Sequence, residues 1–569
     1  MKNIKKLASL LLALVMILSM ATNVFADEVT YSITINNENS GHTYEAYQIF
    51  TGKLSGNVEN DTAAGTTAVL SDIQWGSGVS AEGKTALLTK YGVDSAAALA
   101  EKLNNGNIKD FVTAVSKYLI GTPKSTNTVS EGKYVIEGLA AGYYLVKDQN
   151  GSLSGDNDSY TSYILEVVEN STLNPKSSVP QVQKKVDDKN DSDNSEDAVE
   201  WEDSADYDIG DEVPFQLKAT LASNVESYLK YKVVFHDTMS AGLTYVRIDS
   251  VKIVNKEGGE ITLNAGDYTV GTAKLADNTA TENFVEGTAL TITIEDAKGL
   301  GAKNDAIVYV EYTATLNSTA LLGAPGNPNV VYLEYSNNPN WGWDVWTDKD
   351  NDGKWDKDET PGMDTPENPN NPYGDETGKT PEDKVIVFTY KLNVNKITLD
   401  ENGKSVALTG AVFTLEKKLA NGTWKEITLT VKDNVFSSTG LDDGIYRLTE
   451  TKAPVGYNQL TDPIYFKVEA THDELANDPA LNTLTVTLID ENGDEIDENG
   501  NVIADVESGD LGSFTADVTS GFIATNVVNN AGVSLPETGG MGTTLFYVFG
   551  GILVLSAVVL LVTKRRMAA

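Results

Sequence analysis

The 569-residue sequence has no cysteine, only three histidines and few basic residues. Without cysteine the chain cannot form a disulfide, so any covalent cross-link within it must use other side chains. The histidines, His42, His236 and His472, leave little material for histidine-based catalysis or zinc ligation. Acidic residues outnumber basic ones by 82 to 43, which gives a net charge of −39. This charge argues against nucleic acid as a partner and favours solubility at a cell surface.

Sequence motifs of several enzyme classes are also missing. The chain has no glycine-rich phosphate loop, no metalloprotease helix and no nucleophile elbow. A wall-anchored hydrolase would need paired catalytic carboxylates, and no such motif is present. We therefore do not expect an enzyme with turnover.

Both ends of the chain carry signals for export and anchoring. Lysines and an apolar run over residues 7–20 precede Val24-Phe25-Ala26, which is typical of a signal peptide, residues 1–26, cut after Ala26. Residues 545–562 carry no charge and, as a transmembrane helix, nearly span the apolar core of a bilayer. The basic tail Lys564-Arg565-Arg566 then keeps the C-terminus in the cytoplasm.

A proline-containing pentapeptide, Leu535-Pro536-Glu537-Thr538-Gly539, stands just before the apolar run. A plain single-span anchor with a juxtamembrane loop is one interpretation. The order of pentapeptide, apolar span and basic tail over residues 531–569 resembles the cell-wall sorting signal of Gram-positive surface proteins. That resemblance implies that a sortase cuts between Thr538 and Gly539 and joins Thr538 to an amine.

Between these signals the patterns predict three mostly β domains. The first has alternating strands and two short helices, over residues 96–103 and 108–119, and is therefore α+β. The other two have short strands separated by Gly, Asn and Asp turns, which is typical of immunoglobulin-like β-sandwiches. The predicted boundaries are 27–178 for the first domain, 179–391 for the second, with an inserted loop at 338–380, and 392–530 for the third.

Two polar residues of the third domain lie on apolar strand faces, and a third ends a strand with a less regular phase. Lys396 alternates with Leu392 and Val394. Glu450 alternates with Tyr446 and Leu448, and Asn529 follows the strand over residues 522–528. The three side chains could meet in one apolar core, although each by itself could equally be an exposed residue at a strand end.

The surrounding sequence resembles the B-type (Cna-type) domain of collagen adhesins and Gram-positive pilins. The resemblance rests on Gly410-Ala411-Val412-Phe413 and on the segment from Gly444 to Tyr457, and it covers residues 392–530. It implies an intramolecular isopeptide bond in which the Lys396 amine attacks the Asn529 amide and Glu450 moves the proton. Burial would keep the lysine neutral and the glutamic acid protonated. Asn526 and Asn530 are the competing acceptors.

The second domain carries a parallel set that resembles the A-type isopeptide domain of backbone pilins. Lys184 alternates with Val182 and Val186, and Asn337 is in phase with the apolar residues of its strand. Asp237 stands at a strand end between them and would take the place of the glutamic acid. The resemblance implies a bond from Lys184 to Asn337 with Asp237 as the acid, and Glu311 is the alternative acid.

A second amine of interest, Lys176, follows Asn174-Pro175 at the junction of the first and second domains. It is either an ordinary linker lysine or, by resemblance to the Tyr-Pro-Lys motif of backbone pilins, the amine that accepts Thr538 of another subunit. Asn174 stands here where that motif more often has Tyr. The first domain contains a segment, Gly142 to Asp148, that echoes Gly444 to Glu450, but we assign it no cross-link.

The inserted loop matches the spacing of a twelve-residue calcium loop. Calcium requires six or more oxygen ligands, and this spacing wraps them around one ion. The alternative is a solvated acidic loop, since the helices that flank an EF-hand are absent. The candidate ligands, the seventh position through its backbone carbonyl, are Asp348, Asp350, Asp352, Lys354, Asp356 and Glu359.

Together these features predict the backbone subunit of a covalent Gram-positive pilus, anchored to the cell wall. The implied partners are other copies of the chain, pilin-specific and housekeeping sortases and peptidoglycan, with accessory pilins and host surface ligands as further candidates. The alternative is a monomeric wall-anchored adhesin that binds host matrix through its first domain and needs no reactive Lys176.

Overall fold

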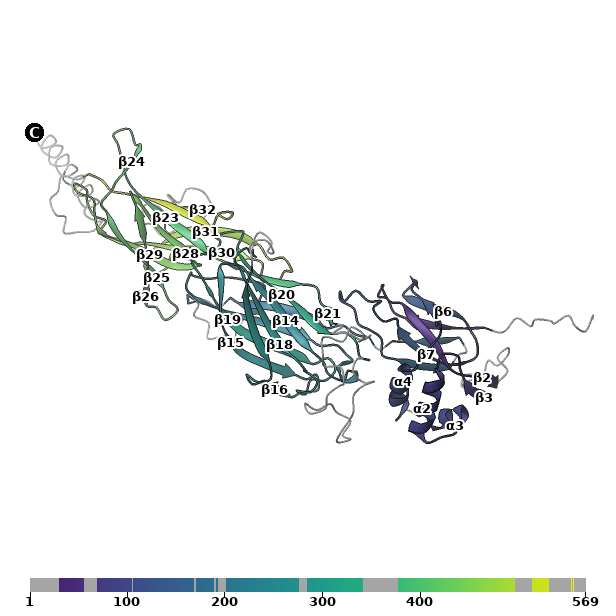
Figure 1. Cartoon of the computed structure of the whole chain (residues 1–569). Coiled ribbons are helices and arrows are strands. Elements are labelled where there is room, and N and C mark those ends of the chain that lie inside the picture. The colour runs from purple at the N-terminus through teal and green to yellow at the C-terminus, as the bar shows by residue number, and fades with distance from the viewer. Residues whose placement is uncertain are drawn as a thin grey trace, which may run out of the picture. The chain divides into compact units, whose positions relative to one another are not determined.

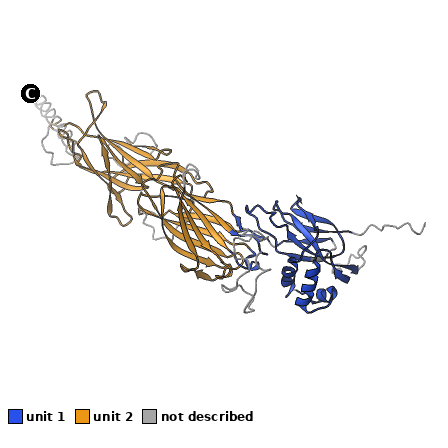
Figure 2. Ribbon diagram, in the orientation of Figure 1, with its two compact units in different colours: residues 1–179, 223–231, 335–379 blue, residues 180–222, 232–334, 380–569 orange. Residues whose placement is uncertain are grey.

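The computed structural model shows a mostly β chain that divides into two compact units (Figures 1 and 2). The first unit is residues 1–179, 223–231 and 335–379, and the second is residues 180–222, 232–334 and 380–569. Residues 179, 223–231 and 335–379 of the predicted second domain thus belong to the first unit. The structure describes residues 30–55, 69–104, 106–167, 170–175, 177–188, 191–192, 201–275, 284–340, 377–496 and 514–531, together with 554 and 556.

The strands of the first unit form two sheets around an apolar core. Alternation buries Ile33 and Ile35 of β1 against Tyr44, Tyr134 and Val146. One sheet has the order β5 (Val129–Ser130), β6 (Lys133–Leu139), β1 (Tyr31–Asn36), β9 (Ser171–Leu173). The other has the order β3 (Val69–Trp75), β2 (Tyr44–Ser55), β7 (Gly142–Asp148), β8 (Ile164–Val167), with β4 (Lys124–Thr126) also paired to β2.

Three helices pack beside these sheets. The predicted helices are confirmed as α3 (Ala96–Lys102) and α4 (Ile108–Ser116), and α2 (Ala81–Tyr91) is additional. Ser80 and Ser95 cap α2 and α3 by accepting backbone N–H bonds, and Gly92 ends α2 in a left-handed conformation.

The predicted second domain is a sandwich of two sheets in the second unit. The first sheet has the order β11 (Trp201–Glu202), β10 (Gln181–Asp187), β13 (Glu212–Thr220), β19 (Ile307–Leu316), β15 (Leu243–Val254), β16 (Glu260–Thr262). The second has the order β12 (Ser204–Asp206), β22 (Asp383–Phe388), β20 (Asn327–Ser336), β14 (Val233–Met239), β18 (Thr288–Ile294), β17 (Thr269–Lys274). The short strand β21 (Thr377–Lys379) falls in the first unit.

The third domain is a second sandwich in the same unit. One sheet has the order β27 (Thr430–Lys432), β28 (Val435–Leu441), β23 (Tyr390–Leu399), β33 (Phe522–Val528), β32 (Thr515–Asp517), with β24 (Ser405–Ala407) also paired to β23. The other has the order β26 (Trp424–Ile427), β25 (Val412–Lys418), β29 (Gly444–Lys452), β30 (Ile464–His472), β31 (Leu481–Ile489). The strands β23 and β33, which begin and end this domain, are parallel neighbours, and Lys396 lies opposite Val527.

Buried ion pairs join the two sandwiches of the second unit. The Lys417 side chain on β25 is fully buried and contacts Asp442 of its own domain. Its Nζ also lies 2.7 Å from Asp191 Oδ1 and 3.1 Å from Asp208 Oδ2, both in the second domain. Burial by itself would lower the pKa of Lys417, but these carboxylates outweigh it and raise that pKa above its usual value. Lys417 therefore stays charged, and its ion pairs hold together the joint, by which we mean the contact region between the two sandwiches.

No helix among the described residues is long and apolar enough to cross a membrane. The predicted span at 545–562 lies outside those residues except for Val554 and Ser556. The signal peptide, residues 1–26, lies outside them as well.

Replacing Lys417 by Met should destabilise the second unit by about 3–5 kcal/mol, because buried carboxylates lose their counter-charge. Guanidinium unfolding measures this loss. The matched control is Lys418→Met on the same strand, whose side chain is only partly buried. Equal stabilities of the two variants would contradict the role of Lys417.

Candidate functional sites

The three residues predicted for the third domain meet in its core. Lys396 lies on β23, Glu450 on β29, and Asn529 directly after β33. They are 0%, 2% and 1% exposed, so water is excluded from all three. The backbone N–H of Asn529 donates to the Ile397 carbonyl over 3.0 Å, which continues the β23–β33 pairing and aims the amide at Lys396.

The carboxyl group of Glu450 bridges the amine and the amide. Lys396 Nζ lies 3.3 Å from Glu450 Oε1 and donates to Asn529 Oδ1. Asn529 Nδ2 lies 3.1 Å from the same Oε1 and 3.3 Å from Oε2. The Leu460 N–H holds Oε2 at 2.9 Å. A proton can therefore pass between the lysine amine and the amide nitrogen through one carboxyl group.

The surroundings of Lys396 favour an uncharged amine. Burial lowers its pKa, and the nearby Glu450 only partly opposes this shift. The Phe413 ring lies 5.5 Å from Nζ and forms part of the apolar wall. The competing acceptors lie elsewhere, because Asn526 and Asn530 are exposed and Asn526 bonds Asn395.

In the second domain Lys184 and Asp237 meet as predicted, and a tyrosine joins them. Lys184 Nζ contacts Asp237 Oδ2, and both side chains are fully buried. Lys184 Nζ also donates to the Tyr312 hydroxyl over 2.8 Å, and that hydroxyl lies 3.1 Å from Asp237 Oδ2. Burial lowers the pKa of Lys184 and raises the pKa of Asp237, although each group opposes the shift of the other. Both shifts favour the uncharged forms.

The asparagine beside this cluster is Asn329 rather than the predicted Asn337. Asn329 Nδ2 donates to the Tyr312 hydroxyl over 2.7 Å, so it touches the same oxygen as Lys184. Its Oδ1 is buried without a hydrogen-bond partner among the described residues. Asn337 follows eight residues later, roughly 26 Å along an extended chain. Asn337 itself belongs to the first unit, where its amide nitrogen lies 3.5 Å from Asp158 Oδ1.

The alternative acid, Glu311, faces away from Lys184. It neighbours Tyr312 on β19, so alternation turns it to the opposite face. There it accepts from Gln216 Nε2 at 3.1 Å and from Ser250 Oγ at 3.0 Å. Tyr312 was not among the predicted site residues, since a tyrosine in an apolar strand has no signal that separates it from ordinary core.

The first-domain segment that echoes Gly444 to Glu450 has a different environment. Asp148 faces His42 Nδ1 at 2.8 Å and accepts from the Thr161 N–H at 2.6 Å. The neighbouring Lys147 lies 3.5 Å from Glu45 and donates to Asn150 over 2.9 Å. These contacts do not suggest a cross-link between distant strands.

Three predicted sites fall outside the described residues. These are Lys176, the pentapeptide Leu535–Gly539, and the acidic loop that contains Asp348, Asp350, Asp352, Lys354, Asp356 and Glu359. Asn174, which precedes Lys176 by two positions in the sequence, is described, and its Oδ1 accepts a hydrogen bond from Asn36 Nδ2 over 2.9 Å. Asn174 also lines a cavity of about 390 Å³ in the first unit, together with Leu173 and Tyr163.

Family comparisons match three consecutive parts of the chain. Residues 209–339 match the Gram-positive pilin backbone subunit 2, Cna-B-like domain. Residues 391–479 match the SpaA prealbumin-like fold domain, and residues 527–568 match the LPXTG cell wall anchor motif. The chain is homologous to Gram-positive backbone pilins.

Individual relatives resemble this pilin over nearly its whole length. The trypsin-resistant surface T6 protein of Streptococcus pyogenes serotype M6 is 24% identical over 591 aligned residues, which cover 95% of each chain. The solved T6 backbone pilin of serotype M6 S. pyogenes is 18% identical, covers 89% of this chain and 99% of its own, and has a TM-score of 0.48. SpaD, the major pilin of Corynebacterium diphtheriae, is 18% identical, covers 88% and 98%, and has a TM-score of 0.42.

The family-model matches and the T6 surface protein confirm the class of protein. The chain is a structural pilus subunit rather than an enzyme, and it is anchored to the cell wall at the bacterial surface. The LPXTG match and the homology to backbone pilins imply a sortase substrate that assembles with other pilin subunits.

Proposed function

We propose that this pilin is the backbone subunit of a covalent fibre whose second and third domains each close an internal Lys–Asn isopeptide bond. The observation that carries the proposal is the buried cluster of Lys396, Glu450 and Asn529 between the first and last strands of the third domain. A lysine, an acid and an amide in direct contact and out of water are the groups that this reaction needs.

The reaction balances without a cofactor. The neutral Lys396 Nζ attacks Asn529 Cγ beside the Glu450 carboxyl group, which lies 3.3 Å from Nζ and 3.1 Å from Nδ2. Glu450 then carries the proton from Nζ to the departing Nδ2, the Cγ–Nδ2 bond breaks, and ammonia leaves. The 3.1 Å contact between Nδ2 and Glu450 Oε1 favours this transfer.

The second domain offers the same chemistry with Lys184 as the nucleophile, Asp237 as the acid and Asn329 as the acceptor. The Tyr312 hydroxyl contacts all three side chains and would hold them in position for the reaction. We therefore propose Asn329 in place of Asn337.

The bond in the third domain would resist tension along the fibre. It would close a loop of 133 positions, for which a chain-entropy estimate gives about 5 kcal/mol. Because β23 and β33 lie side by side, a force that enters at one strand would pass to the other without unfolding the sandwich.

Intact-mass measurement of the purified protein should show the loss of two ammonia molecules. Glu450→Ala and Asn329→Ala should each restore one of them, since each removes a group that its own bond requires. The control for the second domain is Asn337→Ala, which should keep both losses. An unshifted wild-type mass would contradict both bonds. Loss of one ammonia in Asn337→Ala but two in Asn329→Ala would reverse our assignment of the acceptor.

We further propose that the fibre joins Thr538 of one subunit to Lys176 of the next through an amide bond. Sortase would release the tail after Thr538, and the Lys176 amine would displace the enzyme. The match to the LPXTG anchor motif supports the donor end. On the acceptor side, Asn174 precedes Lys176 by two positions in the sequence. It lines a cavity that could receive an incoming chain end. Such head-to-tail contacts do not close into a ring, so repeating them builds a fibre.

Replacing Lys176 by Ala in cells should abolish the high-molecular-weight ladder of the pilus on denaturing gels. The matched control is Lys90→Ala on the exposed face of α2, which should leave the ladder intact. A ladder that persists without Lys176 would assign the acceptor to another lysine. Wild-type protein found only as a monomer in its native cells would favour the adhesin.

We also propose that the loop at Asp348 to Glu359 binds a structural calcium ion, on the strength of its ligand spacing. Calcium should protect this loop from proteolysis, and a chelator should remove that protection. Asp350→Asn should weaken the effect because it removes a charged ligand. Cleavage that does not depend on calcium would rule the site out.

A further inference from the structure

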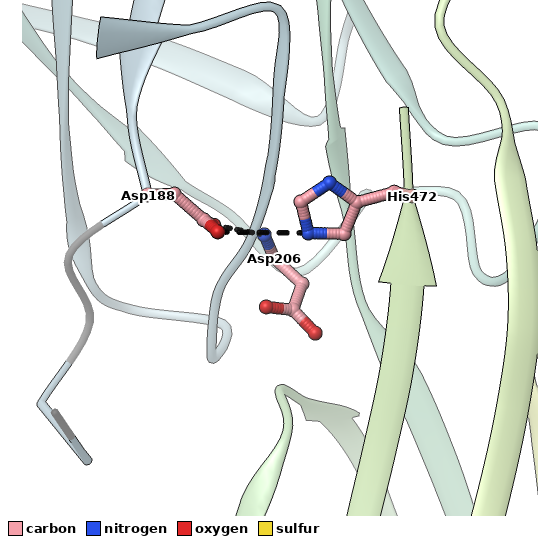
Figure 3. Close-up of side chains that lie close together, drawn as sticks. All are labelled: Asp188, Asp206 and His472. Carbon is pink, nitrogen blue, oxygen red and sulfur yellow. Dashed lines mark hydrogen bonds and ion pairs between the residues drawn. The ribbon is translucent and has the colours of Figure 1, made fainter. Parts of the chain in front are cut away.

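A second polar cluster lies at the joint between the two sandwiches of the second unit. It contains Asp188, which follows β10, Asp206 of β12 and His472 at the end of β30. One ligand atom of each lies within 4.8 Å of the others. Figure 3 shows the Asp188 carboxyl group and the His472 ring facing each other, with Asp206 beside them. The cluster opens on a cavity of about 380 Å³ that Asp443 and Glu474 also line.

The surroundings of His472 set which ring nitrogen carries the proton. Ser204 Oγ donates to the Asp473 carbonyl over 2.6 Å, which uses its only hydrogen. It must therefore accept from His472 Nδ1, which lies 2.8 Å away. With the proton on Nδ1, Nε2 of the neutral ring carries a free lone pair.

The lone pair of His472 points into the cluster. The His472 side chain is 8% exposed, and Nε2 has no hydrogen-bond partner among the described residues. Its nearest polar contact is Asp188 Oδ2 at 3.6 Å. A histidine that donates Nδ1–H to an outer oxygen and presents a bare Nε2 is arranged as metal-binding histidines are.

The charges around Asp188 differ from those around a second acidic cluster at this joint, which contains Asp191 and Asp208. There, the carboxylates of Asp191 and Asp208 are met by the ammonium groups of Lys417 and Lys425. The charges that act most strongly on Asp188 are carboxylates, those of Asp206 and Glu202.

We propose that Asp188, Asp206 and His472 bind a divalent transition-metal ion such as Zn²⁺ that ties the second domain to the third. Two carboxylates and one imidazole suit zinc, whereas calcium prefers oxygen ligands alone. Zinc bonds of about 2.0–2.2 Å require the ligand atoms to close in by roughly 1 Å, and the cavity leaves room for a water as the fourth ligand. Since Asp188 and Asp206 come from one sandwich and His472 from the other, the ion would bridge the joint.

The test is titration of the EDTA-stripped protein with Zn²⁺ by calorimetry and with Co²⁺ by visible absorption. We expect one site per chain whose cobalt spectrum shows mixed nitrogen and oxygen ligands. His472→Asn and Asp188→Asn should each remove it. Ser204→Ala, which keeps all three ligands, should weaken binding roughly tenfold or more because it frees the ring to turn.

Two control variants separate this site from others on an acidic chain. His236→Asn removes a histidine of the same unit that pairs with Glu334, and Asp350→Asn alters the acidic loop. Both should leave the cobalt spectrum unchanged. Binding that survives both His472→Asn and Asp188→Asn, or no binding by the wild type at 100-fold molar excess of metal, would overturn the proposal. Intact mass and circular dichroism verify that every variant is folded.

Discussion

The burial of lysine amines beside carboxyl groups is the constraint on which this pilin depends. An amine in an apolar core loses its hydration, and nearby carboxylates oppose the resulting fall in its pKa. Burial lowers the pKa of Lys396, which lies beside Glu450. It also lowers the pKa of Lys184, which lies beside Asp237 and feels a smaller effect of Asp383. Lys417 faces several carboxylates, and its pKa is raised. The same residue type thus has a lowered pKa in two cores and a raised pKa where the two sandwiches meet.

The order of the strands determines which parts of the chain a bond between these buried groups would connect. Lys396 and Asn529 stand on the neighbouring parallel strands that begin and end their domain, so one bond between them would close the whole sandwich. Lys184 lies on β10, whose end leads to Asp188 at the joint. A cross-link, an ion-pair network and the proposed metal site would then lie in series along the second unit. In a chain without cysteine, each would do work that disulfides do in other exported proteins.

Sequence patterns predicted on which face of a strand a residue lies. They did not predict which residue along that face meets a given partner. Alternation placed Lys396, Glu450 and Lys184 on core faces, and the structure finds each of them buried there. Asn329 and Asn337 both stand in phase with the apolar residues of β20, so periodicity alone could not choose between them. Only the neighbouring Tyr312 shows which of them meets Lys184. The scarcity of histidine suggested little scope for metal ligation, yet the structure places one histidine, His472, beside two aspartates.

By itself the sequence determined the sorting motif, the absence of disulfides, the run of β domains and the third-domain residues Lys396, Glu450 and Asn529. These follow from composition, short motifs and local periodicity, which a single chain displays without folding. The tertiary structure decided which asparagine lies beside the Lys184 cluster, the place of Tyr312, the ion pairs of Lys417 and the grouping of Asp188, Asp206 and His472. Each of these depends on contacts between strands far apart in the chain, and such pairings come from packing and register that no local pattern specifies.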